Sequence, residues 1–502
     1  MFHLKSFIAL SLLLLGTLTL AAENDIVQRG CRRGVMSEST RSRRVKELPR
    51  HVGGDFYLGD RRQLVILAAF QDKQFQGGSA EALSKWDQIF NAENYQESPF
   101  VGSVHDYFYD QSYGKFNLRF DLIYVNLPDS CKKYRSTAIH DEYSQFMVDD
   151  IVDALQTMDV AWDQYDWNGD GFVNQLLIIY AGKGMNADGD KNTVWPHQWW
   201  LSSHIDQTDP QGINYRSYRT VNYGDKAYNV DCYCCIQELI EQKATKSSFG
   251  TICHEYSHCF GFPDFYYGYS TPLGDWELMD SGNYNDAGFC PPNYSAHERW
   301  MMGWSSPVEL TADTVVSLMP ALCYEPQSYL IRNDGYENEY YIIENRLKTG
   351  WDSFLPGSGL LVFHVDYDES IWTSIEESPN DSYKKRYHII PANNKTYYSA
   401  SNSAGWTYPY ISETVTNDSL TNKSLPAAIL NNPNTDGSML MNKSLRHIRV
   451  EDGLASFSFT FDSPTGITDA EAEGRPQELY RFGSIRLMRY PNGVVKKVII
   501  RP

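Results

Sequence analysis

Two histidines and two carboxylic acids stand at metal-binding spacing in residues 254–264, which read HEYSHCFGFPD. Residues four apart lie on the same face of a helix, so His254 and His258 can point both imidazoles at one zinc ion. Glu255 would then lie beside the metal, where it can take a proton from a zinc-bound water molecule. The spacing therefore predicts a zinc site with an acid–base group next to it.

The end of the same motif predicts a third ligand. Gly261 can adopt the left-handed conformation that ends a helix, and the turn after it brings Asp264 back toward the two histidines. Two histidines and one carboxylate leave the fourth position of a tetrahedral zinc ion open. Structural zinc sites fill that position, so the pattern favours a catalytic site.

A helix through this motif would be amphipathic. At 100° per residue, five side chains fall on one apolar stripe, and His254 and His258 project from the opposite side. Ser247 or Ser248 can cap the N-terminus. We expect one side of the helix to pack on a core and the other to face a cleft. The stripe consists of Ile252, Cys253, Tyr256, Cys259 and Phe260.

A second motif follows at residues 276–282, which read WELMDSG. This segment looks like the Met-turn of metzincin-type proteases, in which a methionine forms an apolar floor beneath the metal ligands without binding the metal. Met279 is the residue predicted to take that place.

Together these motifs resemble the immune inhibitor A family of secreted bacterial zinc metalloproteases, and the similarity covers roughly residues 62–395. The resemblance implies a metzincin-like fold and peptidase activity. The family also carries Asp where most metzincins have a third histidine. A tyrosine often stands two residues after the methionine; here that residue is Ser281, which leaves Tyr284 as the candidate for a transition-state tyrosine. Besides the two motifs, the matching segments are 64–72, 103–108, 111–116, 195–197, 343–346 and 356–367.

Residues 166–174, which read DWNGDGFVN, resemble an EF-hand calcium loop. Position 12 of such a loop would be Leu177, so the bidentate glutamate is missing, and residues 175–180 predict a strand instead of a helix. One interpretation is a structural Ca²⁺ site completed by Asp163 or another acid; the other is a simple turn before a strand. The predicted ligands are Asp166, Asn168, Asp170 and Asn174.

His197 lies in the aromatic run WPHQWW at residues 195–200. A histidine among aromatic side chains is more often packed or hydrogen-bonded than a ligand, and we expect this of His197.

Composition limits the class of protein. The 502 residues are too many for one compact core, so two or three domains are expected. A hydrophobic content of 42% with 35 Tyr and 12 Trp indicates a folded protein. The formal charge of -19 argues against nucleic acid as a partner, because phosphates would repel it.

The N-terminus predicts export. Lys5, the apolar run 7–20 and Ala21-Ala22 are typical of a secretory signal peptide, and no other stretch is long enough to span a bilayer. The expected location is therefore secreted or cell-surface. Residues 23–61 are polar and rich in arginine, which fits a solvated linker or, as we prefer for a secreted protease, a cleavable pro-segment.

Nine cysteines leave at least one unpaired in an exported chain, and their pairing cannot be read from the sequence. Cys31 stands among arginines, which favour the thiolate that binds zinc. It could block the open zinc position until the pro-segment is removed. The alternatives are an incidental or disulfide-bonded cysteine, with Asp55 or Asp60 providing latency instead.

Beyond residue 305 the pattern changes to short alternating strands separated by turns. Residues 340–343, 359–365 and 455–461 predict strands of a β-sandwich, and residues 395–443 predict long loops or a flexible insert. The last residues predict a β-hairpin turning at Asn492-Gly493, which is either an ordinary terminal hairpin or a short sorting signal for type IX secretion.

The predicted organisation is α+β: signal peptide 1–22, pro-segment 23–61, metzincin-like catalytic domain 62–305, β-sandwich domain 306–462 and tail 463–502. The predicted function is an exported endopeptidase that uses Zn²⁺, with Ca²⁺ as a second expected ion and proteins or peptides as substrates. The alternative is a surface-binding protein with a protease-like fold, whose β-domain binds glycans or host proteins.

Overall fold

The structure is a computed structural model that describes residues 57–136, 143–188, 190–204, 217–240, 246–268, 270–374, 378–381, 384–396 and 399–462, together with three C-terminal strands. The predicted signal peptide and Cys31 lie outside the described residues, and so does the predicted pro-segment except for residues 57–61. Among the residues that are described, no helix combines the length and apolarity needed to cross a membrane.

The N-terminal half is built on a five-stranded sheet in the order β2-β1-β4-β8-β5. All neighbours in it are parallel except β5, which runs antiparallel to β8. Residues 64–69 of β1 are all buried, and so is Phe70, the first residue after the strand. A parallel strand inside such a sheet is covered on both faces. The strands are β1 (Gly59–Ala69), β2 (Phe116–Asn126), β4 (Leu176–Lys183), β5 (His197–Trp200) and β8 (Cys232–Leu239).

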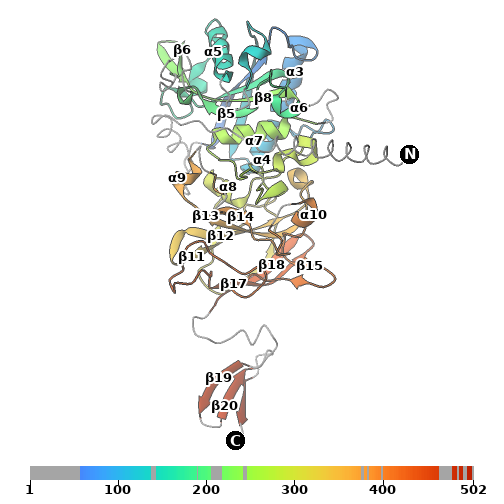
Figure 1. Ribbon diagram of the computed structural model, residues 1–502, viewed down its shortest axis with the longest axis vertical. Coiled ribbons are helices and arrows are strands. Elements are labelled where there is room, and N and C mark those ends of the chain that lie inside the picture. Colours follow the sequence, from blue (N-terminus) through green and yellow to red (C-terminus); the bar gives the residue numbers. More distant parts are fainter. Residues whose placement is uncertain are drawn as a thin grey trace, which may run out of the picture.

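Helices cover both faces of this sheet (Figure 1). Alternate residues of β1 point to opposite faces, so Leu64 and Ile66 pack with α5 while Val65 and Leu67 pack with α3, α4 and α7. The helices are α3 (Gly78–Asn91), α4 (Val104–Gln111), α5 (Ser144–Leu155), α6 (Met185–Asp188), α7 (Phe249–Cys259), α8 (Ala296–Met301), α9 (Glu369–Trp372) and α10 (Ala400–Ser403).

The C-terminal half contains a five-stranded sheet, β14-β13-β12-β11-β9, and a three-stranded sheet, β10-β18-β17, that share a hydrophobic core. The predicted strands at 340–343, 359–365 and 455–461 are confirmed as parts of β12, β13 and β18. The strands are β9 (Val308–Glu309), β10 (Thr314–Met319), β11 (Tyr329–Asn333), β12 (Tyr336–Arg346), β13 (Gly359–Asp366), β14 (Tyr387–Ile389), β17 (Lys443–Glu451) and β18 (Leu454–Phe461).

Short strands complete the fold. In the described residues of the predicted loop segment 395–443, the helices and strands are α10, a two-stranded ribbon and the first residue of β17. Trp406, Tyr408 and Leu420 pack into the cores. The predicted terminal hairpin is present as β20 and β21, and β19, which the sequence pattern did not predict, pairs with β20. These strands are β3 (Phe172–Val173), β6 (Arg219–Tyr223), β7 (Lys226–Val230), β15 (Tyr410–Ile411), β16 (Thr416–Asn417), β19 (Gln477–Phe482), β20 (Ile485–Arg489) and β21 (Val495–Ile499).

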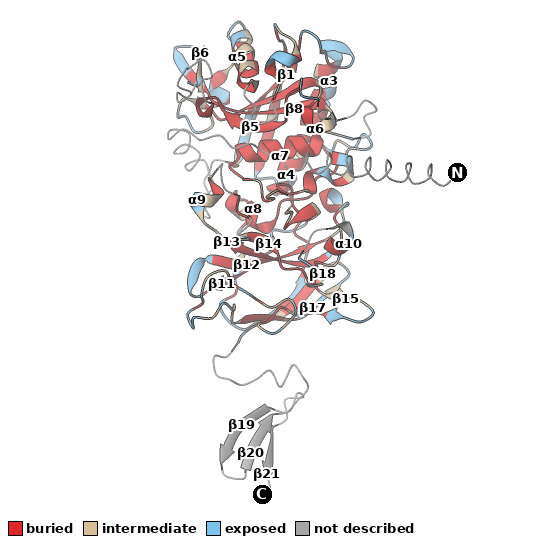
Figure 2. Ribbon diagram, in the orientation of Figure 1, coloured by how far each residue is buried: buried red, intermediate tan, exposed pale blue. Residues whose placement is uncertain are grey.

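The sheet containing β12 and β13 belongs to both halves of the molecule. Tyr340 and Ile342 point into the core that contains α7, whereas Tyr341 and Ile343 point into the core between the two C-terminal sheets. Figure 2 shows the buried region continuing from the N-terminal sheet through α7 and α8 into β12 and β13. The two halves therefore pack through one continuous interior.

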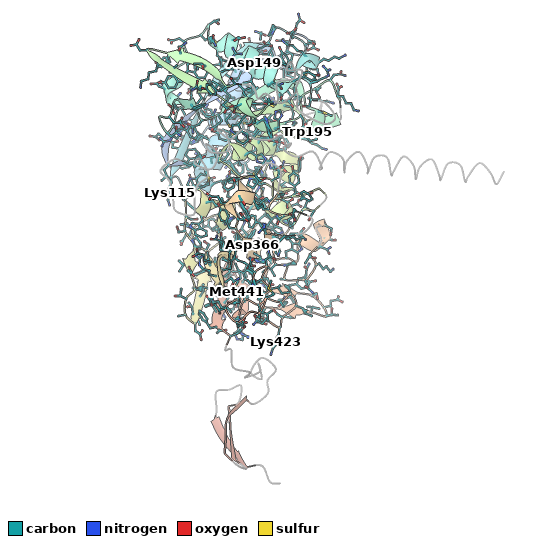
Figure 3. The ribbon with its side chains drawn as sticks, turned by 60° about the vertical axis from the view of Figure 1, so that its left-hand side comes forward. Lys115, Asp149, Trp195, Asp366, Lys423 and Met441 are labelled. Carbon is teal, nitrogen blue, oxygen red and sulfur yellow. The ribbon has the colours of Figure 1, made fainter. Side chains whose placement is uncertain are left out.

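Buried charges also join the halves. Arg346, at the end of β12, has no exposed surface and donates to Asp352 at 2.8 and 2.6 Å, to Glu344 at 2.9 Å and to the carbonyl of Asn293 at 3.1 Å. Within the C-terminal half, another buried carboxylate, Asp366 at the end of β13 (Figure 3), pairs with Lys384 at 2.5 Å and with Arg386 at 3.2 Å and accepts from Asn432. Each of these carboxylates has its charge partner inside the protein, as buried charges require.

Replacing Arg346 with Met should destabilise the protein strongly, because Glu344 and Asp352 would lose their buried cation. The expected loss is about 3–5 kcal/mol in urea unfolding followed by tryptophan fluorescence. Arg332 pairs with Glu309 at 3.1 Å on the surface, so Arg332→Met is the matched control and should cost about 0–1 kcal/mol. Equal losses from the two variants would contradict a structural role for the Arg346 network.

Candidate metal centre

Helix α7 carries the predicted metal-binding motif, and its local sequence explains where it begins and ends. The Ser247 hydroxyl accepts a hydrogen bond from the backbone N–H of Phe249 at 3.0 Å, whereas Ser248 is the N-cap residue without a side-chain cap. At the other end Gly261 has φ +100°, and the N–H groups of Gly261 and Phe262 return to His258 and Ser257. This is a Schellman turn, which needs a left-handed residue and so favours glycine.

The environment of α7 differs in one respect from the amphipathic expectation. Every residue from Phe249 to Cys259 is buried, including the two histidines and Glu255. The apolar stripe packs into a core as predicted, but the polar side is covered by the segments after it. The side chains of the predicted metal-binding motif therefore lie in a largely desolvated environment.

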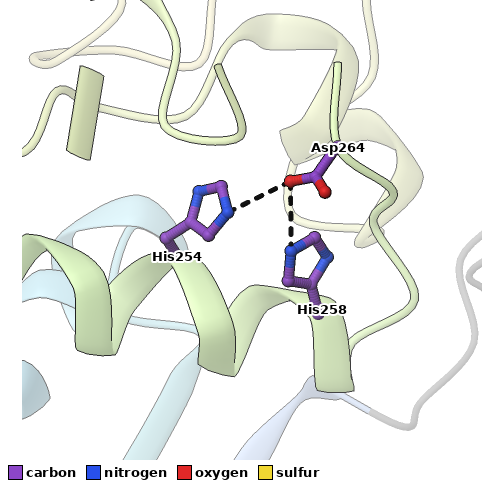
Figure 4. A group of neighbouring side chains, drawn as sticks. All are labelled: His254, His258 and Asp264. Atoms are coloured by element: carbon purple, nitrogen blue, oxygen red, sulfur yellow. Dashed lines mark ion pairs between the residues drawn. The ribbon is translucent and has the colours of Figure 1, made fainter. Parts of the chain in front are cut away.

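The three predicted ligands come together (Figure 4). His254 and His258 project from α7, and Asp264 reaches back from the loop that follows the helix. Its Oδ1 atom lies 3.2 Å from His254 Nε2 and 3.3 Å from His258 Nε2. Among the described residues this is the group of three side chains arranged to hold a metal ion.

The geometry of these atoms fits a zinc ion. Ligand bonds of about 2.0–2.1 Å in a tetrahedral site put neighbouring donor atoms roughly 3.3 Å apart, which matches both distances. His258 Nε2 and Asp264 Oδ1 are buried and, despite their approach, make no hydrogen bond with each other or another group. Buried polar atoms are normally satisfied, so a cation between them would supply the missing partner.

Two backbone carbonyls fix which nitrogen of each ring faces the site. The Nδ1 atom of His254 lies 2.9 Å from the carbonyl of Leu278, and that of His258 lies 2.7 Å from the carbonyl of Phe262. A carbonyl can only accept, so each Nδ1 carries a proton and each Nε2 is the nitrogen that faces the site. Metal-binding histidines are commonly oriented in this way.

Mutual charge interactions set the protonation of the group. Burial lowers the pKa of His254, but the close contact with the Asp264 carboxylate and the charges of Glu255 and Asp264 outweigh it and raise the pKa to about 9. Burial raises the pKa of Asp264, and the two histidines outweigh that effect and hold it well below its usual value. Asp264 therefore stays ionised, and a proton on His254 must leave before a metal ion binds.

The predicted Met-turn is hydrogen-bonded to the loop that carries Asp264. Met279 is fully buried in the core that contains α7, and its carbonyl accepts from the N–H of Phe265, the residue after Asp264. The carboxylate of Asp280 accepts from the N–H groups of Leu273 and Gly274 at 2.9 and 3.0 Å and so closes the loop that carries the Leu278 carbonyl.

A segment of the C-terminal half, which sequence reasoning missed, also positions the third ligand. The Ser378 hydroxyl donates to the carbonyls of Asp264 and Tyr266 at 3.2 Å each, and the amide of Asn380 donates to the carbonyl of Phe265 at 2.7 Å. These residues lie more than a hundred positions from Asp264 in the chain. No local pattern signals such a contact, so only the folded chain reveals it.

A cavity of about 200 Å³ opens beside the ligands, and His254 and Glu255 line it. Tyr284, the predicted candidate for a transition-state tyrosine, lines the same cavity. Its side chain is 49% exposed. Desolvation raises the pKa of its hydroxyl, an effect partly offset by Asn283 and reinforced by the charges of Glu255 and Asp264. Tyr284 therefore keeps its proton and can donate into the cavity.

His197 does not join the metal group. It is buried in β5, its Nδ1 lies 2.6 Å from the carbonyl of Trp195, and its Nε2 lies near Ser144 and Tyr233. This is the packed and hydrogen-bonded role expected for it.

The predicted calcium loop at 166–174 forms a turn whose oxygens accept from its own backbone. Asp166 accepts from the N–H groups of Asp170 and Gly171, Asp170 from Phe172, and Asn174 from Trp167 at 2.6 Å. Strand β4 follows the loop, as expected. Calcium binding here stays a prediction.

The described cysteines are all free thiols, and most are buried. Cys253 and Cys259 point from α7 into the core, where Cys232 and Cys234 of β8 also lie. They act there as small apolar side chains, one of the two roles expected from the sequence.

Comparison with known proteins agrees with this geometry. Residues 60–302 match the family model described as immune inhibitor A peptidase M6, catalytic domain. The chain is also 26% identical over 370 residues to a protein named immune inhibitor A from Bacillus thuringiensis subsp. alesti. That alignment covers 64% of this chain and 51% of the relative, so the chain spans about half the length of the protein it resembles.

Replacing Asp264 with Ala should remove zinc. Two imidazoles without the carboxylate bind the ion less tightly, because no negative ligand then compensates part of its positive charge. The expected result is a purified protein with a small fraction of the wild-type zinc content by elemental analysis. The Ser378 hydroxyl donates to backbone carbonyls of this loop, so Ser378→Ala is a milder control that should retain most of the zinc. Full zinc content in Asp264→Ala would place the third ligand elsewhere in the chain.

Proposed function

Residues 60–302 belong to the immune inhibitor A peptidase M6 family, and on that premise we propose that this protein is an exported zinc-dependent endopeptidase that cleaves proteins or peptides. The observation that carries the proposal is the convergence of His254, His258 and Asp264, with the Nε2 atom of both imidazoles turned toward the carboxylate. Glu255 lies next to His254 on the same buried helix and lines the adjoining cavity.

The chain's own residues then have separate tasks. When bound, the zinc ion would polarise the scissile carbonyl and make a water molecule more acidic. Glu255 takes the proton of the attacking water and passes it to the leaving amine. The Tyr284 hydroxyl, which keeps its proton, donates a hydrogen bond to the oxygen of the former carbonyl as negative charge develops there. The burial of α7 excludes bulk water and strengthens these interactions.

Several further features belong to the same proposal. The catalytic part has a metzincin-like arrangement with Met279 as its floor, and residues 306–462 form a β-sandwich domain. Residues 1–22 direct export, and residues 23–61 act as a pro-segment in which Cys31, Asp55 or Asp60 provides latency. The proposal is supported by the family match and by the core shared between the two C-terminal sheets.

Replacing Glu255 with Gln should abolish peptidase activity while the fold and zinc content are kept, because the change removes the base and no ligand. We expect turnover of a fluorogenic protein substrate to fall by at least about 10³-fold. Elemental analysis and circular dichroism of the same preparation serve as controls. A variant that keeps a tenth of the wild-type turnover would exclude Glu255 as the base, and a zinc-loaded wild type without any cleavage would favour a binding protein with a protease-like fold.

Calcium should raise the melting temperature of the wild type if residues 166–174 bind it, because an ion that binds only the folded state stabilises that state. Asp170→Ala should remove this calcium-dependent shift and leave the zinc content unchanged. The measurement is a thermal melt with and without millimolar calcium. If calcium leaves the wild-type melting temperature unchanged, the loop is only a turn.

A further inference from the structure

One of the described cysteines is not buried. The structure describes eight of the nine cysteines, all as free thiols, and seven of those eight are buried. The exception is Cys323, in the segment between β10 and β11. Thiols inside a core are inert, whereas an accessible thiol of an exported chain meets an oxidising environment. Cys323 is therefore the described cysteine available for a disulfide, and the ninth cysteine is Cys31.

Cys323 lines a cavity at the junction of the two halves of the molecule. The cavity has a volume of about 370 Å³. Helix α4 contributes Tyr109 and Asp110 to its walls, and the segment after β12 contributes Trp351. Of the described residues that line this cavity, none also lines the cavity beside the metal ligands. A segment bound here therefore occupies a different site from the candidate metal centre.

The carboxylate of Asp110 makes the cavity receptive to a cation. One of its oxygens accepts from Trp351 Nε1 at 2.9 Å, and the other makes no hydrogen bond with the described residues. Desolvation and the charge of Asp106 outweigh that hydrogen bond and raise the pKa of Asp110. Ionisation of Asp110 is thus disfavoured in the protein alone, and a cation in the cavity would stabilise the ionised form.

The cation that already acts on Asp110 lies behind the wall of the cavity. Arg299 has no exposed surface, and its guanidinium lies 4.6 Å from the centre of the Tyr113 ring. Its N–H groups donate to Gln111 and Asn293 at 2.9 and 3.1 Å. None of the described residues that line the cavity is lysine or arginine. The place for a positive charge inside the cavity is therefore open.

The sequence around Cys31 complements these walls. Residues 29–34 read RGCRRG, so three guanidinium groups stand within two residues of the thiol. Tyr109 and Tyr324 line the cavity and are 43% and 62% exposed. Aromatic faces and carboxylates both attract guanidinium groups. The arginines also favour the thiolate form of Cys31, which is the form that attacks a disulfide.

The start of the described chain lies near the same region. Asp60 of β1 accepts from Asn117 of β2 at 2.6 Å. Asn117 lines a second cavity, which shares four lining residues with the cavity of Cys323. Cys31 precedes Tyr57 by 26 residues, a span of up to about 90 Å in an extended chain. The segment before Tyr57 is therefore long enough to reach Cys323.

We propose that Cys31 and Cys323 form a disulfide bond that fastens the beginning of the pro-segment into this cavity, with the neighbouring arginines against Asp110 and the tyrosine rings. The inference rests on the proposed export of the chain and on the proposed pro-segment. It commits Cys31 to a partner other than zinc, which leaves Asp55 or Asp60 to provide latency. Cleavage of the chain before β1 does not by itself release the segment, because the disulfide still holds it.

The bond forms by thiol–disulfide exchange with an oxidising disulfide such as oxidised glutathione. The Cys31 thiolate attacks one sulfur of the oxidant and releases the other as a thiolate. The Cys323 thiolate then attacks the Cys31 sulfur of this mixed disulfide and releases the second thiolate. The two cysteines lose two protons and two electrons, and the oxidant gains them as two thiols.

Peptide mapping without reduction gives the first test. The uncleaved precursor is treated with oxidised glutathione, digested and analysed by mass spectrometry. We expect a linked pair of peptides that contain Cys31 and Cys323, lighter by two hydrogens than the two reduced peptides together. A link from either cysteine to any other partner, or no link at all, overturns the proposal.

Peptidase activity measured on the same preparation after cleavage of the pro-segment and reduction separates this inference from the proposed function. A linked precursor that yields no zinc-dependent cleavage of proteins contradicts the peptidase function and leaves the disulfide standing. An active peptidase whose precursor carries no link contradicts the disulfide alone.

Maleimide labelling of the folded precursor gives the second test. The oxidised wild type should show no reactive thiol, whereas Cys31→Ser and Cys323→Ser should each show one, because each variant leaves its partner unpaired. Cys131→Ala is the matched control, since Cys131 is a buried free thiol, and it should show none. Labelling of Cys323 in the oxidised wild type, or no labelling in Cys31→Ser, contradicts the pairing.

Asp110→Asn tests the contribution of charge, and asparagine can still accept from Trp351. The rate of disulfide formation with oxidised glutathione should fall about two- to fivefold, as for the loss of a partly exposed ion pair. Asp225→Asn removes an exposed carboxylate from the turn between β6 and β7 and should leave the rate unchanged. A wild-type rate in Asp110→Asn overturns the role of Asp110 in guiding the segment.

Discussion

Three electron-donating atoms held together in a desolvated environment are the constraint on which this structure depends. Two imidazole nitrogens and one carboxylate oxygen lie about one tetrahedral edge apart, and the side chains that carry them are mostly buried. Lone pairs so close together are costly without a cation between them. The surrounding fold must therefore hold them in place, and nearly every nearby hydrogen bond does so: carbonyls orient both rings, a glycine turn reverses the chain, and the Met-turn fastens the loop of Asp264.

The C-terminal half also helps to hold the three donor atoms in place. The core that contains α7 also contains Leu322, Tyr340 and Trp406, and Ser378 and Asn380 bind the backbone around Asp264. The family match at residues 60–302 thus covers the ligands but not all of the residues that hold them. Because β12 and β13 present one face to each core, a disturbance of the C-terminal sheets is expected to reach the candidate metal site through continuous packing.

The sequence allowed the ligands to be predicted because their information is local. Spacings of three, four and six residues place His254, His258 and Asp264 through helix geometry and a glycine turn, and strand alternation predicted β12, β13 and β18. Three kinds of information were not local. All three arise from tertiary packing. They are the orientation of His254 by the carbonyl of Leu278, the contact of Ser378 with Asp264, and the packing of β12 and β13 against a core on each of their two faces. The burial of the whole of α7 was missed for the same reason, since periodicity reports polarity and not what later segments cover.

A buried carboxyl pair shows how the Met-turn is joined to the rest of the protein. Glu277, two residues before Met279, and Glu298, in the first turn of α8, have no exposed surface. Burial raises the pKa of both, and the charge of Glu298 raises that of Glu277 further. Two ionised carboxylates could not share this environment, so at least one keeps its proton and can donate to the other. Glu298 also accepts from the N–H of Ser295 at 2.7 Å, which caps α8. The Glu298 carboxyl therefore caps α8 and also acts electrostatically on Glu277 in the predicted Met-turn segment, which links that segment to the helix that packs on β12.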